Sequence, residues 1–220
     1  MSEIRGVISD FGGVLTNPLS EGFAAMQRSS DIPLETIGNA MARLAEEDGA
    51  HPLFELETGR LTEHDFLARL GAAVSEDLGR PVELHGFGEA YFAELRPNEP
   101  MIERMRELRG RGYRMALLTN NVREWQPLWR TMLPVDEIFE VLVDSGFVGM
   151  RKPDAEIYEL TLERLGLPAA ACLFVDDTEV NCVAARGLGM TAVHFRETEQ
   201  ALGEIAGALD GGPPGGGGLS

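Results

Sequence analysis

The chain is poor in lysine, in cysteine and in long apolar runs, and each shortage excludes some classes of function. Lysine occurs once, at position 152, and the formal net charge at pH 7 is −17. A chain this acidic is not expected to bind nucleic acid or an anionic membrane surface. No apolar run is long enough to span a bilayer, and the N-terminus carries no secretory signal pattern. We therefore expect a cytoplasmic protein without a membrane partner.

The only two cysteines, Cys172 and Cys182, fall in segments predicted to be buried. Such thiols are more typical of free cysteines in a core than of a disulfide or a metal site, which fits a reducing compartment. The acidic charge also bears on the substrate. An anionic substrate would be repelled by the chain as a whole, so it would need positive charge close to its binding site.

Short apolar segments alternate with helical segments along much of the chain, and this alternation predicts the fold class. With 220 residues, 44% hydrophobic and 25% charged, the chain has the composition of one large or two small globular domains. Continuously apolar strands separated by helices are typical of a parallel sheet that is covered on both faces. We predict strands at residues 4–10, 113–119, 140–143, 171–175 and 191–195.

The alternation is interrupted once, directly after the first strand. Ile37, Met41 and Leu44 repeat there with the spacing of one helical face, and no second buried strand is found before residue 97. We therefore predict an α/β fold in which a helical segment interrupts the sheet-forming domain. The predicted parts are a core domain of residues 1–16 and 97–210, a helical domain of residues 17–96, and a disordered Gly/Pro-rich tail of residues 211–220.

Two details of the helical domain can be predicted from local patterns. Residues 62–65 have the pattern of a helix N-cap, and residues 49–54 interrupt the helical period. Substrate contacts are expected near His51 to Phe54 and in the loop after Asn121. Phe54 itself is expected to be a hinge or core residue.

Polar side chains collect where three of the predicted strands end. They are Asp10 after the first strand, Thr119, Asn120 and Asn121 at the second, and Asp176 and Asp177 at the fourth. In an open parallel sheet, ligands bind outside the carboxyl ends of the strands. We therefore expect these three groups of residues to meet at one edge of the sheet.

The three aspartates predict a magnesium site. Carboxylates that converge would repel one another unless a cation lay between them, and oxygen ligands without His or Cys suit Mg²⁺. Asp176 and Asp177 have an alternative role as caps of the helix that follows, but a cap accounts for only one of them. Asp10 could simply begin a turn, since Gly12 and Gly13 follow it and let the backbone bend sharply.

Lys152 stands out because the chain otherwise uses arginine. A loop lysine is usually solvated, but a compact ammonium can offset part of an acidic cluster and bind a phosphoryl oxygen. Thr119 and Asn120 offer a hydroxyl and an amide that can donate hydrogen bonds to phosphate. An Asn-rich turn after a strand is also common without any ligand, so these two residues alone are weak evidence.

Taken together, four segments resemble the motifs of the haloacid dehalogenase superfamily. They are VISDFGGVLT (7–16), MALLTNN (115–121), GMRKPDAEIY (149–158) and LFVDDTEVNCVAARGLGM (173–190). Members of this superfamily are mostly Mg²⁺-dependent phosphohydrolases that act through an aspartyl-phosphate on a Rossmann-like core. The helical segment is similar to the inserted α-helical cap domain of β-phosphoglucomutase-like and epoxide-hydrolase N-terminal-like members.

The resemblance implies roles for the acidic residues. Asp10 would be the nucleophile that attacks phosphorus, and its carboxylate would also bind Mg²⁺. The Gly12 carbonyl, Asp176 and Asp177 would be the other metal ligands. Asn181, one helical turn past Asp177, would steady the loop that carries the acidic pair.

The resemblance also implies roles for the phosphoryl-binding residues. Thr119 and Lys152 would act in catalysis, and Lys152, Asn120 and Asn121 would bind the phosphoryl group. The implied substrate is a small phosphorylated metabolite, and a homodimer remains open as the assembly.

One position departs from the motif pattern of the superfamily. Its phosphatases usually carry a second Asp two residues after the nucleophile, as the general acid/base, and here that position is Gly12. Losing a positioned proton donor costs roughly 10²–10⁴-fold when the leaving group needs a proton. A substrate with a good leaving group, such as an acyl phosphate, or a proton from water or the helical domain, would compensate. Alternatively, the protein binds phosphorylated ligands and turns them over poorly. A metal-free 2-haloacid dehalogenase is disfavoured, because Asp176 and Asp177 are both present.

Overall fold

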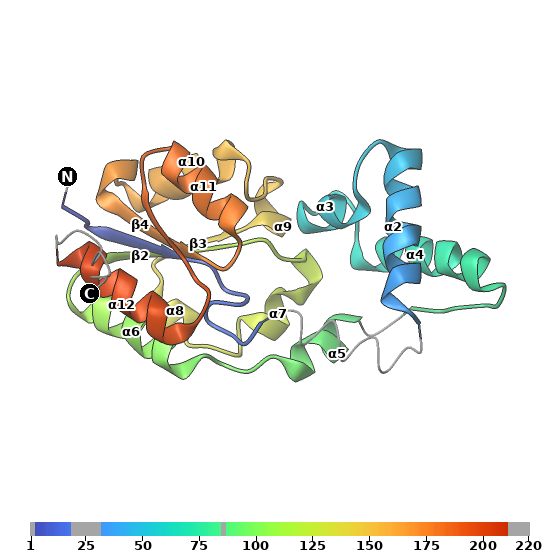
Figure 1. The fold of residues 1–220 in the computed structure, drawn as a ribbon, viewed down its shortest axis with the longest axis horizontal. Coiled ribbons are helices and arrows are strands. Elements are labelled where there is room, and N and C mark those ends of the chain that lie inside the picture. Colours follow the sequence, from blue (N-terminus) through green and yellow to red (C-terminus); the bar gives the residue numbers. More distant parts are fainter. Residues whose placement is uncertain (1–2, 19–31, 85–86, 211–220) are drawn as a thin grey trace, which may run out of the picture.

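The computed structural model describes residues 3–18, 32–84 and 87–210, and its core is a parallel sheet of five strands (Figure 1). All neighbouring strands pair in parallel, in the spatial order β3-β2-β1-β4-β5. The predicted α/β class is confirmed. The strands are β1 (Gly6–Ser9), β2 (Arg114–Thr119), β3 (Val141–Asp144), β4 (Cys172–Asp176) and β5 (Thr191–His194).

The central strands are continuously apolar because both faces of the sheet are covered. All four residues of β1 are buried, and so are all five of β4. Val7 packs in one hydrophobic cluster with Met101 of α6 (Glu99–Gly110) and Ile205 of α12 (Thr198–Leu209). Ile8, on the other face, packs in a second cluster with Ile157 of α10 (Ala155–Leu165) and Cys182 of α11 (Glu179–Gly187). Alternate residues of one strand therefore serve two separate cores.

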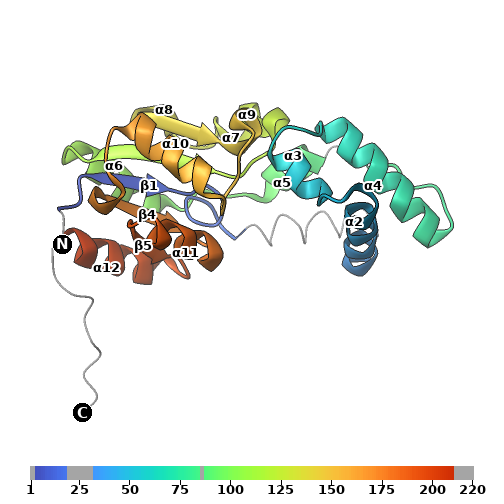
Figure 2. The ribbon, with the colours of Figure 1, turned by 90° about the horizontal axis from the view of Figure 1, so that it is seen from above.

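The helical insertion, defined here as residues 32–84 and 87–96, lies to one side of the sheet and its covering helices (Figures 1 and 2). Its α2 follows Pro33, and its α4 is capped by the Thr62 hydroxyl, which accepts a hydrogen bond from the Asp65 N–H. The start of α4 was predicted from the pattern of residues 62–65. The helices are α2 (Leu34–Asp48), α3 (Pro52–Glu57), α4 (Glu63–Leu78) and α5 (Phe87–Glu94).

The chain leaves the core and returns to it along two adjacent segments. Thr16 and Pro97 form an isolated antiparallel bridge, and the Asn17 N–H donates to the Arg96 carbonyl at 3.0 Å. The Asn98 N–H donates to the Leu15 carbonyl at 2.9 Å. These contacts lie at the predicted boundary between the helical domain and the core, although the division into two folding units stays a prediction.

Short helices account for most differences from the predicted elements. The expected break at residues 49–54 contains the start of α3, where Pro52 occupies the first turn and the His51 side chain accepts from the Leu53 N–H. Phe54 is 41% exposed and lines the cavity described below, so it is not a core residue, and its alternative role as a hinge stays a prediction. After β2 the chain forms a 3₁₀ turn (Arg123–Trp125) that runs into the short helix α7 (Gln126–Trp129). Two further four-residue helices, α8 (Val135–Ile138) and α9 (Ser145–Val148), are likewise too short to show a period in the sequence.

Both cysteines are free and buried, as predicted. Burial raises the pKa of the Cys172 thiol to about 11, so that thiol stays protonated at neutral pH. Among the described helices, none combines the length and the apolar character needed to cross a membrane. The predicted disordered tail of residues 211–220 lies outside the described residues.

Candidate active site

Asp10 lies directly after the central strand β1, at the carboxyl edge of the sheet. Its backbone N–H donates to the Val175 carbonyl at 2.9 Å, which extends the pairing of β1 with β4 by one residue. Its Oδ1 accepts from the Phe11 N–H at 2.7 Å and lies 2.8 Å from Lys152 Nζ. A backbone N–H and a cation thus hold the carboxylate through the same oxygen, Oδ1.

Lys152 is buried at the centre of the cluster. Its Nζ lies 2.8 Å from Asp10 Oδ1 and 2.7 Å from Asp176 Oδ2, and it donates to the Leu118 carbonyl at 3.0 Å. Burial alone would lower the pKa of this ammonium, but the two carboxylates raise it above its ordinary value. Lys152 is therefore a permanent cation with all three of its protons engaged.

The electrostatic state of Asp10 depends on several opposing effects. Burial, the largest of them, raises the pKa of Asp10 well above its ordinary value, and Lys152 lowers it. Asp176 and Asp177 raise it again, because their negative charges disfavour a third one nearby. A cation added to the cluster would oppose this effect and favour the ionised form, which is the nucleophilic one.

Asp176 and Asp177 follow one another but have different surroundings. Asp176 is fully buried, and its Oδ1 accepts from the Thr178 N–H at 2.8 Å and from Asn181 Nδ2 at 3.0 Å. With Lys152 at Oδ2, both of its oxygens have protein partners. Asp177 is half-buried, and burial and the Asp176 charge raise its pKa. Asn181 thus holds Asp176 directly, while its implied role in steadying the whole loop stays a prediction.

The three carboxylates are close enough to share one ion. Asp10, Asp176 and Asp177 each offer a ligand oxygen, and these oxygens lie within 4.8 Å of one another. If all three are ionised, Lys152 leaves two negative charges uncompensated, which one divalent cation would neutralise. The all-oxygen donor set fits Mg²⁺.

The turn after Asp10 contains two glycines, and its geometry requires the second of them. Gly13 has φ +75°, and a Cβ there would overlap the Asp177 carboxylate. The backbone thus passes against Asp177 with no room for a side chain. The sequence predicted a sharp turn from the two glycines. It could not show that Gly13, after β1, lies against Asp177, after β4, because this contact depends on the packing of the two strands.

The three polar residues at the end of β2 are placed differently from one another. Thr119 is the last residue of β2 and is 2% exposed. Asn120 is tied to the backbone of Lys152, with its Nδ2 3.0 Å from the carbonyl and its Oδ1 2.8 Å from the N–H. The Oδ1 of Asn121 accepts from the Val122 N–H at 2.9 Å. Both asparagine side chains therefore hold local structure, and a direct contact with substrate stays a prediction.

A cavity of about 450 Å³ opens between this cluster and the helical insertion. Among the predicted site residues, those that line it are Asp10, Gly12, Thr119, Asn120, Asn121, Lys152 and Asp177. Asp176, 0% exposed, lies behind them and does not reach the cavity surface. The structure thus brings every predicted site residue to one place and separates one of them from the cavity.

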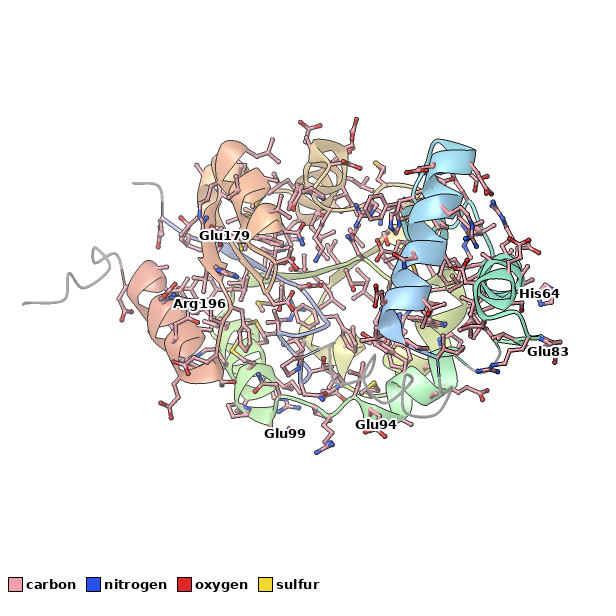
Figure 3. The ribbon with its side chains drawn as sticks, turned by 45° about the vertical axis from the view of Figure 1, so that its right-hand side comes forward. His64, Glu83, Glu94, Glu99, Glu179 and Arg196 are labelled. Atoms are coloured by element: carbon pink, nitrogen blue, oxygen red, sulfur yellow. The ribbon has the colours of Figure 1, made fainter. Side chains whose placement is uncertain are left out.

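The charge on the outside of the molecule contrasts with the cation inside. The labelled side chains of Glu83, Glu94 and Glu99 point outward from the ribbon (Figure 3). Among the described residues that line the cavity, the cations are Arg151 and Lys152. The predicted need for local positive charge is thus met at these two adjacent positions.

Comparison with known proteins gives a family and several relatives. A family model described as haloacid dehalogenase-like hydrolase matches residues 4–189. The chain is 29% identical to acyl-CoA dehydrogenase family member 10 of Mus musculus over 212 residues, which are 93% of this chain but only 19% of that protein. It is 28% identical to sesquiterpene phosphatase astK of Aspergillus oryzae over 204 residues, 88% of this chain and 91% of that protein.

Solved structures share the fold. A HAD family enzyme of Bacteroides thetaiotaomicron, bt-2542, aligns with a TM-score of 0.65 at 23% identity, covering 87% of this chain and 93% of its own. That enzyme has also been solved in complex with magnesium and inorganic phosphate, with a TM-score of 0.60 to this chain. At this level of identity the likeness concerns the fold alone.

Proposed function

Because the chain belongs to the haloacid dehalogenase-like hydrolases, whose family model matches residues 4–189, we propose that it is a Mg²⁺-dependent phosphatase that forms an aspartyl-phosphate on Asp10. One observation carries the proposal. The Asp10 carboxylate is held by the Phe11 N–H and by Lys152 Nζ at the surface of a cavity, beside two further carboxylates. Such an arrangement supplies a nucleophile, a cation for a phosphoryl group and oxygen ligands for a metal.

The metal would be held by Asp10, the Gly12 carbonyl and the acidic pair. Asp177 suits direct coordination, because it reaches the cavity and Asp176 does not. Asp176 has protein partners at both oxygens, so its proposed part is to act through a water or to position its neighbours. When bound, Mg²⁺ would supply positive charge that favours the ionised nucleophile and offsets charge on the phosphoryl oxygens.

The reaction divides into two displacements at phosphorus. In the first, an oxygen of Asp10 attacks, the bond from phosphorus to the leaving oxygen breaks, and the leaving group departs with the electron pair. In the second, water attacks the phosphorus of the aspartyl-phosphate, inorganic phosphate is released, and the Asp10 carboxylate is restored. Lys152 would offset the negative charge of the phosphoryl group in both steps, and the Thr119 hydroxyl would donate to a phosphoryl oxygen.

The glycine at position 12 limits the choice of substrate. Gly12 provides no side chain to protonate a leaving alkoxide. Substrates whose leaving group is already a stable anion should therefore react fastest. An acyl phosphate leaves as a carboxylate and needs no proton at neutral pH. The same glycine supports the second candidate function, a protein that binds phosphorylated ligands and turns them over slowly.

The helical insertion would act as a cap over the site. Its residues complete the cavity wall opposite the catalytic cluster, and cap closure would exclude bulk water during phosphoryl transfer. The chain leaves and re-enters the core at Thr16 and Pro97, which offers a short connection about which such a cap could move.

The test is hydrolysis of acetyl phosphate and p-nitrophenyl phosphate with Mg²⁺, by wild type and by Asp10→Asn. We expect Mg²⁺-dependent phosphate release that is lost in Asp10→Asn, and transient ³²P labelling of the wild type from ³²P-acetyl phosphate. Turnover that survives the substitution would exclude Asp10 as the nucleophile. Chloride release from 2-chloropropionate without metal would instead identify a dehalogenase. Tight phosphate binding without turnover would favour the binding protein.

A further inference from the structure

The cavity beside Asp10 has two walls of different chemistry. The core side carries the carboxylates, the Thr119 hydroxyl and the Lys152 ammonium, whereas the helical insertion contributes mostly hydrocarbon. Apolar or aromatic side chains of the insertion line this second wall, among them Met41, Leu53, Phe66, Tyr91, Phe92 and Leu95. They come from four separate helices and the turn after α5, so the apolar wall is not the by-product of one helix face.

The polar groups of this wall are few. Among the described residues of the helical insertion that line the cavity, only Glu57 and Tyr91 carry a polar side-chain group. Glu57 Oε2 accepts from Arg151 Nε at 2.9 Å, so this carboxylate is already paired. The Tyr91 ring stacks on Trp125 with 5.4 Å between ring centroids, and both residues line the cavity.

A sugar or polyol fits such a wall poorly. Each substrate hydroxyl that loses water must find a protein partner, and a hydroxyl left without one weakens binding roughly 5- to 150-fold. A sugar phosphate presents several hydroxyls at once. A hydrocarbon body loses nothing on leaving water and gains from contact with the apolar wall.

The cations of the cavity limit the number of anionic groups on the substrate. Lys152 is paired within the catalytic cluster, and Arg151 is paired with Glu57 while its guanidinium lies 3.9 Å over the Phe54 ring. No further cation lines the cavity among the residues that the structure describes. The site therefore suits one phosphate, with no second phosphate or carboxylate on the rest of the ligand.

We propose that the substrate is a monophosphate carried on a hydrocarbon body, aliphatic or aromatic, rather than a sugar or polyol phosphate. This inference rests on the proposed phosphatase function and names the substrate class of the same site. The volume of about 450 Å³ is within the range of small-molecule pockets, so the cavity has room for a hydrocarbon body along with the phosphate.

A series of acyl phosphates tests the proposal without changing the leaving chemistry. The leaving group is a carboxylate in each member of the series: acetyl, butyryl, hexanoyl and octanoyl phosphate. The members therefore differ in the length of the hydrocarbon chain and not in the kind of leaving group. We expect kcat/KM to rise about fourfold for each methylene until the cavity is filled, which corresponds to about 0.8 kcal/mol per methylene. Glucose 6-phosphate and glycerol phosphate should be poor substrates and weak competitors of octanoyl phosphate.

Binding of alkylphosphonates separates the two proposals, because phosphonates cannot be hydrolysed. Affinity for methyl-, butyl- and octylphosphonate, measured by calorimetry with Mg²⁺, should also rise with chain length. Hydrolysis of acetyl phosphate without any gain along either series would overturn the substrate class and leave the phosphatase intact. Absence of all hydrolysis, together with a rise along the phosphonate series, would overturn the phosphatase and support the ligand class.

Matched variants locate the effect in the helical insertion. Leu53→Asn places an amide in the cavity wall and should lower kcat/KM for octanoyl phosphate at least tenfold more than for acetyl phosphate. Leu61→Asn makes the same change at a partly buried leucine of the insertion that does not line the cavity, and should leave the chain-length dependence unchanged. Equal loss in both variants would contradict the assignment of this wall. If Leu53→Asn fails to fold, the wild-type phosphonate series still decides.

Discussion

The side-chain amide of Asn120 and the backbone of Lys152 form a reciprocal pair of hydrogen bonds. Asn120 Nδ2 donates to the Lys152 carbonyl at 3.0 Å, and Asn120 Oδ1 accepts from the Lys152 N–H at 2.8 Å. The end of β2 is thereby joined to the loop that carries the buried ammonium. Asn120 is a positioning residue in this arrangement, since Lys152 is the group that contacts Asp10.

Asn120→Ala removes both hydrogen bonds and should let the Lys152 loop shift. We expect kcat for acetyl phosphate to fall roughly 10- to 100-fold, because a misplacement of about 1 Å at a reacting centre has effects of this size. The KM should change much less. Steady-state kinetics at saturating Mg²⁺ measure both quantities.

A double-mutant cycle distinguishes positioning from direct phosphate contact. In a Lys152→Ala background, Asn120→Ala should have little further effect on the residual rate, because its partner no longer acts. Full additivity of the two losses would mean that Asn120 works independently of Lys152, as a ligand of the phosphoryl group would.

Lys152→Met should destabilise the fold as well as lower the activity to a small residual rate. The change leaves the carboxylates of Asp10 and Asp176 buried without their cation, and breaking a buried ion pair in this way costs about 3–5 kcal/mol. Urea unfolding at pH 7.5 without metal measures the loss. The double variant Lys152→Met/Asp176→Asn removes one of the orphaned charges and should recover part of the stability. A double variant less stable than Lys152→Met would contradict this account.

Gly13→Ala should weaken metal binding through a steric effect on Asp177. The added Cβ would overlap the Asp177 carboxylate, and the positive φ of +75° adds about 1–2 kcal/mol of backbone strain. We expect the concentration of Mg²⁺ needed for half-maximal activity to rise at least tenfold. Thermal unfolding with and without Mg²⁺ gives a second measure, since the stabilisation by the ion should shrink.

Gly49→Ala is the matched control for strain. Gly49 has φ +68°, and a Cβ there would meet nothing within 4 Å. This variant should lose stability by a similar strain and keep the wild-type response to Mg²⁺. An equal loss of Mg²⁺ response in both variants would show that strain, and not the contact with Asp177, is responsible.

The sequence was sufficient to predict which residues lie together in the site wherever strand topology alone decides their position. In a parallel sheet, residues that end neighbouring strands must meet at one edge, so Asp10, Thr119 and Asp176 were brought together by their positions in the chain. Lys152 was singled out by its rarity, and the structure places it among these residues. Neither inference needed a side-chain conformation.

Side-chain partners and the cavity wall could not be predicted in the same way. An amide such as that of Asn120 can bind a phosphate or a backbone equally well, and only the fold shows that the Lys152 backbone takes both of its groups. The helix α3 is six residues long, too short to show a helical period in the sequence. The segment was therefore predicted only as an interruption of the helical pattern, and the contribution of Leu53 to the cavity wall could not be predicted. The cavity itself depends on how the insertion sits against the core, which no local pattern specifies.

Asp144, at the end of β3, carries a buried carboxyl outside the catalytic cluster. Its Oδ1 caps α9 by accepting from the Gly146 N–H at 3.0 Å, while its buried Oδ2 has no hydrogen-bond partner among the described residues. Burial, partly opposed by this hydrogen bond and by Arg123, raises the pKa of Asp144 to about 6. The group is therefore a source of pH-dependent instability in the folded state.

Asp144→Asn should stabilise the protein at pH 7.5 and remove part of its pH dependence. Between the ordinary pKa of 3.8 and the folded value of about 6, the unfolded chain releases this proton while the folded protein keeps it. Stability therefore falls as the pH rises through that window, by at most about 3 kcal/mol at 1.36 kcal/mol per pKa unit. We expect the variant to gain about 1–3 kcal/mol at pH 7.5 and almost nothing at pH 4, measured by urea unfolding. Glu83→Gln, which neutralises an exposed carboxyl, serves as the control. A variant that gains as much at pH 4 as at pH 7.5 would mean that packing, and not the charge of Asp144, sets the difference.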